Sequence, residues 1–159
     1  MKLEKKISAI LVRRGMNISV AESCTGGLIS KRITDIAGSS TYFLSGLVTY
    51  SNAAKTKYLS VPERTIARHG AVSEIVARDM AKGVRKSLDA DIGLSVTGIA
   101  GPGGGSTEKP VGLVYMALSS QKKVFAAKFV FSGNRTQIRK QAADKALQML
   151  LDYLEGRLA

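Results

Sequence analysis

The stretch VAESCTGGLIS, Val20–Ser30, joins an apolar run to two glycines through the cluster Ser23, Cys24 and Thr25. Residues 17–21 alternate apolar and small side chains, which predicts a strand, and the apolar residues after the glycines have helical spacing. We therefore expect a tight turn from a strand into a helix. This turn either packs small residues together or presents a nucleophile at the start of the helix.

On both sides of this turn, the sequence shows helix and strand patterns along its whole length. Helices are expected over residues 3–14, 28–38 and 52–60, in a short piece opened by Pro62, over 73–88, and from about Asn134 onward. Strands are expected over residues 17–21, 42–51, 91–98, 111–120 and 122–133, with the last two forming an antiparallel pair. The order, roughly αβαβααβββα, predicts the α/β class: a single three-layer domain over residues 1–159, with a mixed sheet covered by helices.

The composition is that of an ordinary globular domain. A chain of 159 residues, 45% of them hydrophobic, fits one domain with its own core. No apolar run approaches the roughly 18–20 residues that span a bilayer. The N-terminal lysines precede an amphipathic helix and no cleavage site. We expect a cytoplasmic protein with no membrane partner.

Single cysteine and histidine residues restrict the chemistry. With one cysteine, Cys24, and one histidine, His69, the chain can form neither an internal disulfide nor a zinc site of nitrogen and sulfur ligands. No metal and no cofactor are expected. A Ser-His-Asp triad would have to use His69, which is expected at the end of a short helix, as a cation near its last carbonyls.

The charge balance favours an anionic partner. Lysine and arginine number 24 against 12 acidic residues, a net charge of +12. A phosphate-bearing metabolite, a nucleic acid or a membrane surface would all fit this sign. However, the basic residues are scattered, the chain has no tryptophan, and only 6% of its residues are aromatic and able to stack on bases. Nucleic acid is therefore an unlikely partner.

Polar or glycine-rich segments follow three expected strands, where ligands collect in open α/β sheets. In the first, Ser23 or Thr25 could simply cap the next helix, and the local pattern favours this. Alternatively, Ser23 is a nucleophile, and unpaired N–H groups at the helix start hold the oxyanion. A serine nucleophile needs a base. Lys55 is the best placed lysine, because burial and the nearby helix N-terminus would both lower its pKa.

The third segment, TGIAGPGGG, carries Thr97, Gly98 and Gly101. Glycines allow backbone N–H groups to approach a phosphate or carboxamide closely. The segment is neither a Walker A loop nor a dinucleotide fingerprint, since no Gly-Lys-Ser/Thr and no helix follow it. A long flexible loop is the alternative interpretation. Arg135, at the start of the last helix, is a candidate phosphate contact.

Five blocks, in order, resemble the C-terminal domain of the competence/damage-inducible CinA family. They are AESCTGG, GLVTYSNAAK, HGAVSE, SVTGIAGPGGGSTEKPVG and FSGNR, and the similarity runs from about Lys5 to the last helix. Stand-alone members of this family are nicotinamide-nucleotide amidohydrolases. The resemblance implies hydrolysis of the carboxamide of nicotinamide mononucleotide to nicotinate mononucleotide and ammonia, without a metal.

The resemblance also implies roles for individual residues. Ser23 falls on the nucleophile, Lys55 on the base and Tyr50 on an assisting hydroxyl, which reverses the local preference for Ser23 as a cap. The residues expected to bind the substrate are Thr25, Gly26, Gly27, Thr97, Gly98, Gly101 and Arg135. Cys24 is the rival nucleophile, although a small buried side chain is its ordinary interpretation.

Two other functions stay open at this point. One is a non-catalytic, nucleic-acid-associated module in competence or damage response, which would bind with a steep salt dependence and would not need Ser23. The other is an amidase acting on a related pyridine or nucleotide amide, with the same Ser23 and Lys55. The expected partner is a small anionic nucleotide substrate, and a homo-oligomer is expected.

Overall fold

A five-stranded mixed sheet lies at the centre of the fold, and its strands have the order β2-β1-β3-β4-β5. Its strands are β1 (Ile18–Glu22), β2 (Phe43–Val48), β3 (Ile92–Gly98), β4 (Leu113–Ser119) and β5 (Val124–Val130). β1 pairs in parallel with β2 and β3, whereas β4 is antiparallel to both β3 and β5. The structure, a computed structural model, describes residues 1–158. It confirms the α/β class and the antiparallel pair.

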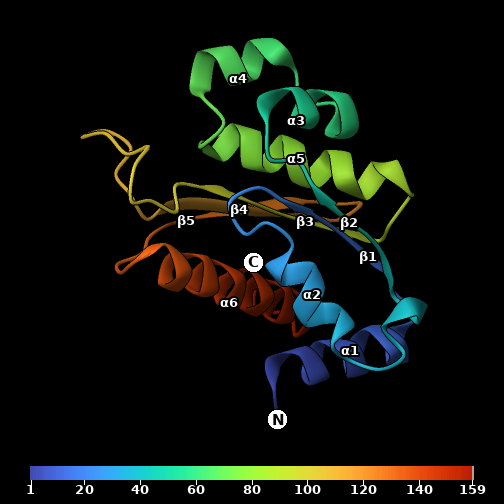
Figure 1. The fold of residues 1–159 in the computed structure, drawn as a ribbon. Coiled ribbons are helices and arrows are strands. Elements are labelled where there is room, and N and C mark those ends of the chain that lie inside the picture. Colours follow the sequence, from blue (N-terminus) through green and yellow to red (C-terminus); the bar gives the residue numbers. More distant parts are fainter. Residues whose placement is uncertain (159) are drawn as a thin grey trace.

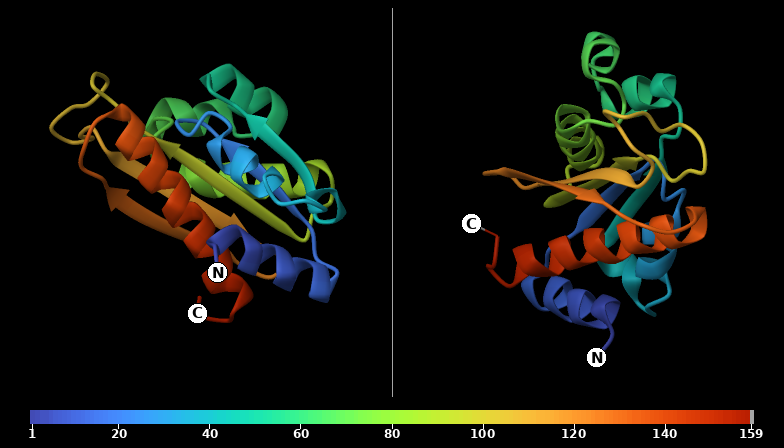
Figure 2. Two further views of the ribbon diagram at one scale, coloured as in Figure 1. Left: turned by 60° about the horizontal axis from the view of Figure 1, so that its bottom comes forward. Right: turned by 90° about the vertical axis from the view of Figure 1, so that its left-hand side faces the viewer.

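Helices cover both faces of this sheet. They are α1 (Leu3–Arg14), α2 (Leu28–Thr34), α3 (Asn52–Leu59), α4 (Glu63–His69), α5 (Glu74–Ser87) and α6 (Arg135–Leu154), with a 3-10 turn at Ser39–Thr41. Figure 1 shows α1, α2 and α6 on one face and α3, α4 and α5 on the other, and Figure 2 shows the same layers from two further sides. The three layers match the expectation. The structure has three helices between β2 and β3, and the short helical piece expected after Pro62, which the order αβαβααβββα does not count, is α4.

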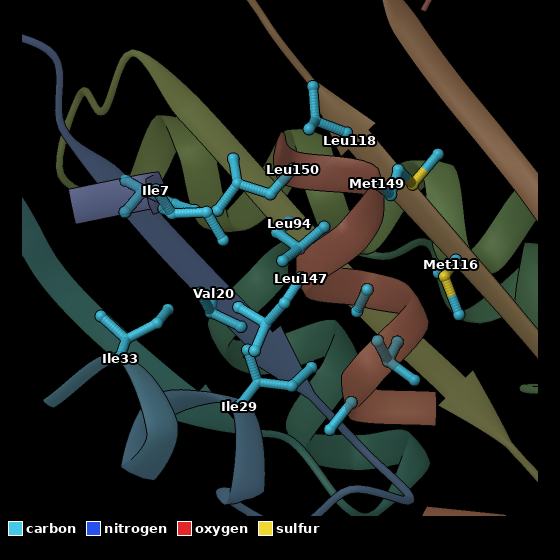
Figure 3. Packing of buried hydrophobic residues seen from close by; sticks show 14 of the residues in the cluster. Ile7, Val20, Ile29, Ile33, Leu94, Met116, Leu118, Leu147, Met149 and Leu150 are labelled. Atoms are coloured by element: carbon cyan, nitrogen blue, oxygen red, sulfur yellow. The ribbon is translucent and has the colours of Figure 1, made fainter. Parts of the chain in front are cut away.

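The larger apolar core lies between the sheet and α1, α2 and α6. Alternate residues of a strand point to opposite faces, and the apolar side chains of β1, β3 and β4 on this face meet those of the three helices (Figure 3). The labelled members of this cluster are Ile7, Val20, Ile29, Ile33, Leu94, Met116, Leu118, Leu147, Met149 and Leu150. These residues fix the sheet against α6, whose first turns lie beside the candidate site.

On the other face, α5 packs closely because the side chains between it and the sheet are small. A Cβ added to Gly93 would lie 2.2 Å from the Ala81 carbonyl oxygen, so only glycine fits there. Two residues further along β3, on the same face, the Ser95 hydroxyl donates to the Ala77 carbonyl oxygen at 2.6 Å. The helices α3 and α4 in turn pack against α5, on its side away from the sheet (Figure 1).

Several helix ends are where the sequence predicts them. The Ser51 and Ser73 hydroxyls cap α3 and α5, and Asn134 forms a capping box with Gln137 at the start of α6. Three elements are clearly shorter than expected, and one of them is β5, which was expected over residues 122–133 and covers Val124–Val130. α2 ends at Thr34 and does not reach Gly38, and β2 ends at Val48, so that Tyr50 and Ser51 belong to the connection before α3. Within residues 1–158, no helix has both the length and the apolar character needed to cross a bilayer.

Candidate active site

The site lies at the edge of the sheet where the parallel strands β1, β2 and β3 all end. Because strand residues alternate between faces, Glu22 and Ser23 leave the end of β1 in opposite directions. The Glu22 carboxylate turns toward the start of α2, and the Ser23 hydroxyl toward α3. The N–H of Ser23 donates to the Val96 carbonyl oxygen of β3 at 3.0 Å, which ties the turn to the neighbouring strand.

Ser23 and Lys55 are in direct contact. The Lys55 Nζ lies 3.0 Å from the Ser23 Oγ, 2.8 Å from the Thr49 carbonyl oxygen and 3.3 Å from the Tyr50 carbonyl oxygen. Lys55 and Leu59 are one helical turn apart on the buried side of α3, and only 1% of Lys55 is exposed. The expected pairing of serine and lysine is therefore present in the geometry, from two elements 32 residues apart.

Burial lowers the pKa of the Lys55 amine from its usual 10.5 to about 8, because the charged form loses its hydration. No carboxylate forms a salt bridge with Lys55 within residues 1–158. A neutral amine has two N–H groups and one lone pair. The two carbonyl oxygens can only accept, so they take the N–H groups and leave the lone pair facing the Ser23 hydroxyl. Neutral Lys55 is thus oriented to accept the Ser23 proton.

Cys24 points away from this pair. Its thiol belongs to the apolar core beneath α6, and only 6% of the residue is exposed. Burial raises the pKa of the Cys24 thiol to about 11, so the nucleophilic thiolate is scarce at neutral pH. The interpretation of Cys24 as a small buried side chain is confirmed.

Neither Ser23 nor Thr25 caps α2, contrary to the local pattern. The residue before the helix is Gly27, which has no side chain, and the fully buried Glu22 carboxylate replaces the missing cap. It accepts from the Ile29 N–H at 2.9 Å, and from both the N–H and the hydroxyl of Ser30 at 3.0 and 2.7 Å. The first N–H groups of α2 are therefore already occupied. The expectation that they are free to hold an oxyanion is wrong.

We predict that Glu22→Gln lowers the free energy of unfolding by about 2 kcal/mol, because the amide nitrogen of glutamine would face an N–H of α2 and leave it without an acceptor. Urea unfolding at pH 7 measures the change. Glu108→Gln, an exposed change of the same kind in the glycine-rich loop, is the control and should alter stability by less than about 0.5 kcal/mol. Equal stability of the two variants would contradict the capping role of Glu22.

Arg135 contacts two other residues that were expected at the site, Tyr50 and Gly101. Its Nη2 donates to the Tyr50 hydroxyl at 3.0 Å, and its Nη1 donates to the Gly101 carbonyl oxygen at 2.7 Å. Tyr50 links the two halves of the site, because its carbonyl oxygen contacts Lys55 and its hydroxyl contacts Arg135. The Tyr50 hydroxyl thus lies at the arginine end and not between Ser23 and Lys55. Arg135 is exposed and free to meet an anion.

Two residues of the glycine-rich segment TGIAGPGGG, Thr97 and Gly98, have structural partners. The Thr97 hydroxyl donates to the Ala71 carbonyl oxygen at 2.9 Å and so anchors the link between α4 and α5. Gly98 ends β3 against β4, where a Cβ would lie 2.7 Å from the Val114 Cγ2. Packing alone accounts for this glycine. The loop beyond it returns directly into β4 and opens no helix (Figure 2).

The turn after Ser23 depends on its two glycines. Gly26 and Gly27 have positive φ angles of 57° and 102°, which favour glycine over residues with a Cβ. Near this turn, the hydroxyls of Thr25 and Thr49 are buried without a hydrogen-bond partner in the described part of the chain. Buried polar groups are almost always paired. Both residues are almost completely buried, so these hydroxyls are enclosed by the protein and do not form part of the surface that a substrate reaches.

Glu22 and Thr49 lie at the site but were not among the residues predicted from the sequence. Glu22 has the signal of a carboxylate inside a strand that is otherwise buried, whereas Thr49 has no distinctive signal. No cluster of three His, Cys, Asp or Glu residues that could hold a metal ion occurs among residues 1–158.

Together, fold and site define an α/β domain with a buried serine–lysine pair where its parallel strands end. The chain belongs to the CinA C-terminal domain family, whose model matches residues 1–154. It is 53% identical over 148 residues to a "CinA-like protein" of Desulfotalea psychrophila, and 49% identical over 156 residues to a "Putative competence-damage inducible protein" of Caldanaerobacter subterraneus. These matches cover 93% and 98% of this chain but only 36% and 38% of the relatives, so the chain spans little more than a third of their length.

Solved structures of similar proteins have the same fold. A competence/damage inducible protein from Agrobacterium tumefaciens is 42% identical, with a TM-score of 0.91 and coverage of 96% of this chain and 95% of that one. A CinA superfamily protein from Klebsiella pneumoniae is 32% identical, with a TM-score of 0.93 and coverage of 97% and 96%. The fold of nearly the whole chain is therefore shared with these proteins.

Proposed function

We propose that the chain hydrolyses the carboxamide of nicotinamide mononucleotide to nicotinate mononucleotide and ammonia. The observation that carries this proposal is the contact between the Ser23 Oγ and the buried Lys55 Nζ, with two carbonyl oxygens directing the amine toward the hydroxyl. A base with a pKa of about 8 suits proton transfer near neutral pH. The family resemblance supplies the choice of substrate.

The chemistry proceeds in two acyl-transfer steps. Neutral Lys55 takes the proton of Ser23 as Oγ attacks the carboxamide carbon, and the resulting ammonium then gives that proton to the departing nitrogen. Ammonia leaves, and the acyl group stays on Ser23 as an ester. Lys55 next deprotonates a water molecule, which attacks the ester, and the lysine ammonium returns this proton to the departing Ser23 Oγ. The products are the free carboxylic acid and the restored serine.

The other end of the site fits the phosphate of the substrate. Arg135 offers a guanidinium beside the Tyr50 hydroxyl, and Tyr50 also reaches Lys55 through its carbonyl oxygen. A single ligand that carries an amide at one end and a phosphate at the other would therefore contact both clusters.

We predict that Arg135→Ala raises KM for nicotinamide mononucleotide by about 10- to 100-fold, the value of one charge-assisted hydrogen bond, and leaves kcat nearly unchanged. Ammonia release is measured with this substrate and with nicotinamide riboside, which lacks the phosphate. The riboside should be a poor substrate that does not distinguish wild type from Arg135→Ala. The exposed change Arg13→Ala on α1 is the control for loss of one positive charge.

Different results of this assay favour different functions. Equal turnover of mononucleotide and riboside would favour an amidase for a related pyridine amide, with Ser23 and Lys55 unchanged in role. No ammonia from any nicotinamide compound across a pH series would contradict the enzyme. Salt-dependent binding to nucleic acid would then become the function to test.

A further inference from the structure

Arg139 contacts the turn after Ser23 from the opposite face of the sheet. It lies on α6, one helical turn after Arg135, and its side chain is half buried. Its Nε donates to the Cys24 carbonyl oxygen at 3.0 Å, and its Nη2 donates to the Thr25 carbonyl oxygen at 2.9 Å. No carboxylate pairs with it within residues 1–158, whereas the half-buried Arg32 contacts two. A half-buried cation that contacts backbone oxygens and no carboxylate needs an explanation.

These two contacts fix the direction of two peptide groups. A trans peptide is planar, and its C=O and N–H point in opposite directions. Because both carbonyls face Arg139, the N–H groups of Thr25 and Gly26 point away from it. The Gly26 N–H donates to the Ser23 carbonyl oxygen at 3.1 Å, so this opposite side is the side of Ser23. The Thr25 N–H, on the same side, has no acceptor in the described part of the chain.

The first N–H groups of α2 itself are not free donors. Glu22 already occupies the N–H groups of Ile29 and Ser30, and the Leu28 N–H donates to the Thr25 carbonyl oxygen. Gly26 also packs directly under the arginine, since a Cβ there would lie 3.2 Å from the Arg139 Nη2. Glu22 thus accepts from the N–H groups of α2 that follow the turn, and Arg139 donates to carbonyl oxygens of the turn itself.

We propose that Arg139 is a positioning residue for amide hydrolysis: it fixes and polarises the Cys24–Thr25 peptide group so that the Thr25 N–H holds the oxyanion formed at Ser23. A cation bound to a carbonyl oxygen strengthens the N–H of the same peptide group as a donor. A donor that is already oriented stabilises the tetrahedral intermediate more than the flat amide. This inference rests on the function proposed above.

The test compares four proteins in the ammonia assay: wild type, Arg139→Met, Arg139→Lys and Lys140→Met. Lys140 is the matched control, because it is the next residue of α6, is exposed, and within residues 1–158 forms an ion pair only with Asp144 on its own helix. Removing a preorganised oxyanion donor costs about 10²- to 10³-fold in kcat, so this is the loss expected for Arg139→Met. Arg139→Lys retains the charge but not the fork that reaches two carbonyls, and we expect a loss of about 10-fold.

Ground-state binding separates this role from a purely structural one. The affinity for nicotinamide mononucleotide is measured at equilibrium in Ser23→Ala and in the double variant Ser23→Ala/Arg139→Met, neither of which turns it over. We expect the two dissociation constants to agree within about threefold, because a group that acts on the transition state contributes little to substrate binding. Circular dichroism and thermal unfolding confirm that each variant is folded.

Three results would overturn the inference. An unchanged kcat in folded Arg139→Met would show that the Thr25 N–H does not need the arginine. A loss of kcat accompanied by an equal loss of substrate affinity or of folded protein would assign Arg139 a structural role only. Absence of ammonia release from wild type would overturn the proposed function and this inference together, whereas the first two results leave the proposed function intact.

Discussion

Replacing Ser23 by alanine is expected to reduce ammonia release from nicotinamide mononucleotide by about 10⁴-fold or more, to the residual level that binding alone supports. The Ser23 Oγ is the only hydroxyl that contacts the Lys55 Nζ in the described part of the chain. Alanine removes the attacking atom and leaves Lys55 with its two carbonyl partners. Thermal unfolding should show a folded protein, because only 8% of Ser23 is exposed and alanine is smaller than serine.

Cys24→Ala is the matched control for this variant. It removes the neighbouring thiol, whose pKa burial raises to about 11, and should leave the rate of ammonia release within about threefold of wild type. If Cys24→Ala lost activity while folded Ser23→Ala retained it, Cys24 and not Ser23 would be the nucleophile.

Lys55→Met is expected to lower kcat/KM by about 10²- to 10⁴-fold, the contribution of a positioned general base. Methionine has nearly the shape of the lysine side chain but cannot accept a proton. The exposed Lys57→Met, in the same helix, removes an equal charge and should keep full activity. An active Lys55→Met protein would show that another group activates Ser23.

The pH dependence of the wild-type enzyme should report the same lysine. Because the base must be neutral, kcat/KM should rise about tenfold per pH unit below the Lys55 pKa of about 8 and level off above it. The same shift affects stability. The folded chain binds this proton more weakly than the unfolded chain, so the free energy of unfolding should gain a contribution from Lys55 as pH rises from about 8 to 10.5. In Lys55→Met this contribution should be absent.

The sequence predicts most of the fold because its signals are local. Apolar spacing identifies the helices and strands, and the starts expected at residue 52, residue 73 and about Asn134 lie within one residue of the observed starts of α3, α5 and α6. The end of α2 is different. Ile36 continues the helical pattern, yet the chain must reverse between residues 35 and 42 to bring β2 beside β1. The pairing of β2 with β1 imposes this reversal, and the local sequence pattern does not indicate it.

The site shows the same division between local and distant information. Ser23, Lys55 and Arg135 follow from motifs, and the first two meet as expected. Glu22 and Arg139 were not expected, because their partners become neighbours only when α2 and α6 pack on the sheet. Arg139 contacts carbonyl oxygens that lie 114 and 115 residues away in the chain. Backbone groups carry no residue-specific signal, so such contacts cannot be read from side-chain patterns.

The most direct test of the central claim, acyl transfer through Ser23, is turnover of nicotinamide mononucleotide in the presence of hydroxylamine. An ester on Ser23 can be attacked by hydroxylamine as well as by water, so we predict that wild type forms the hydroxamate beside nicotinate mononucleotide, and that Ser23→Ala forms neither. Ammonia and acid formed at the full rate with no hydroxamate at any hydroxylamine concentration would contradict the claim, as would hydroxamate formed by folded Ser23→Ala.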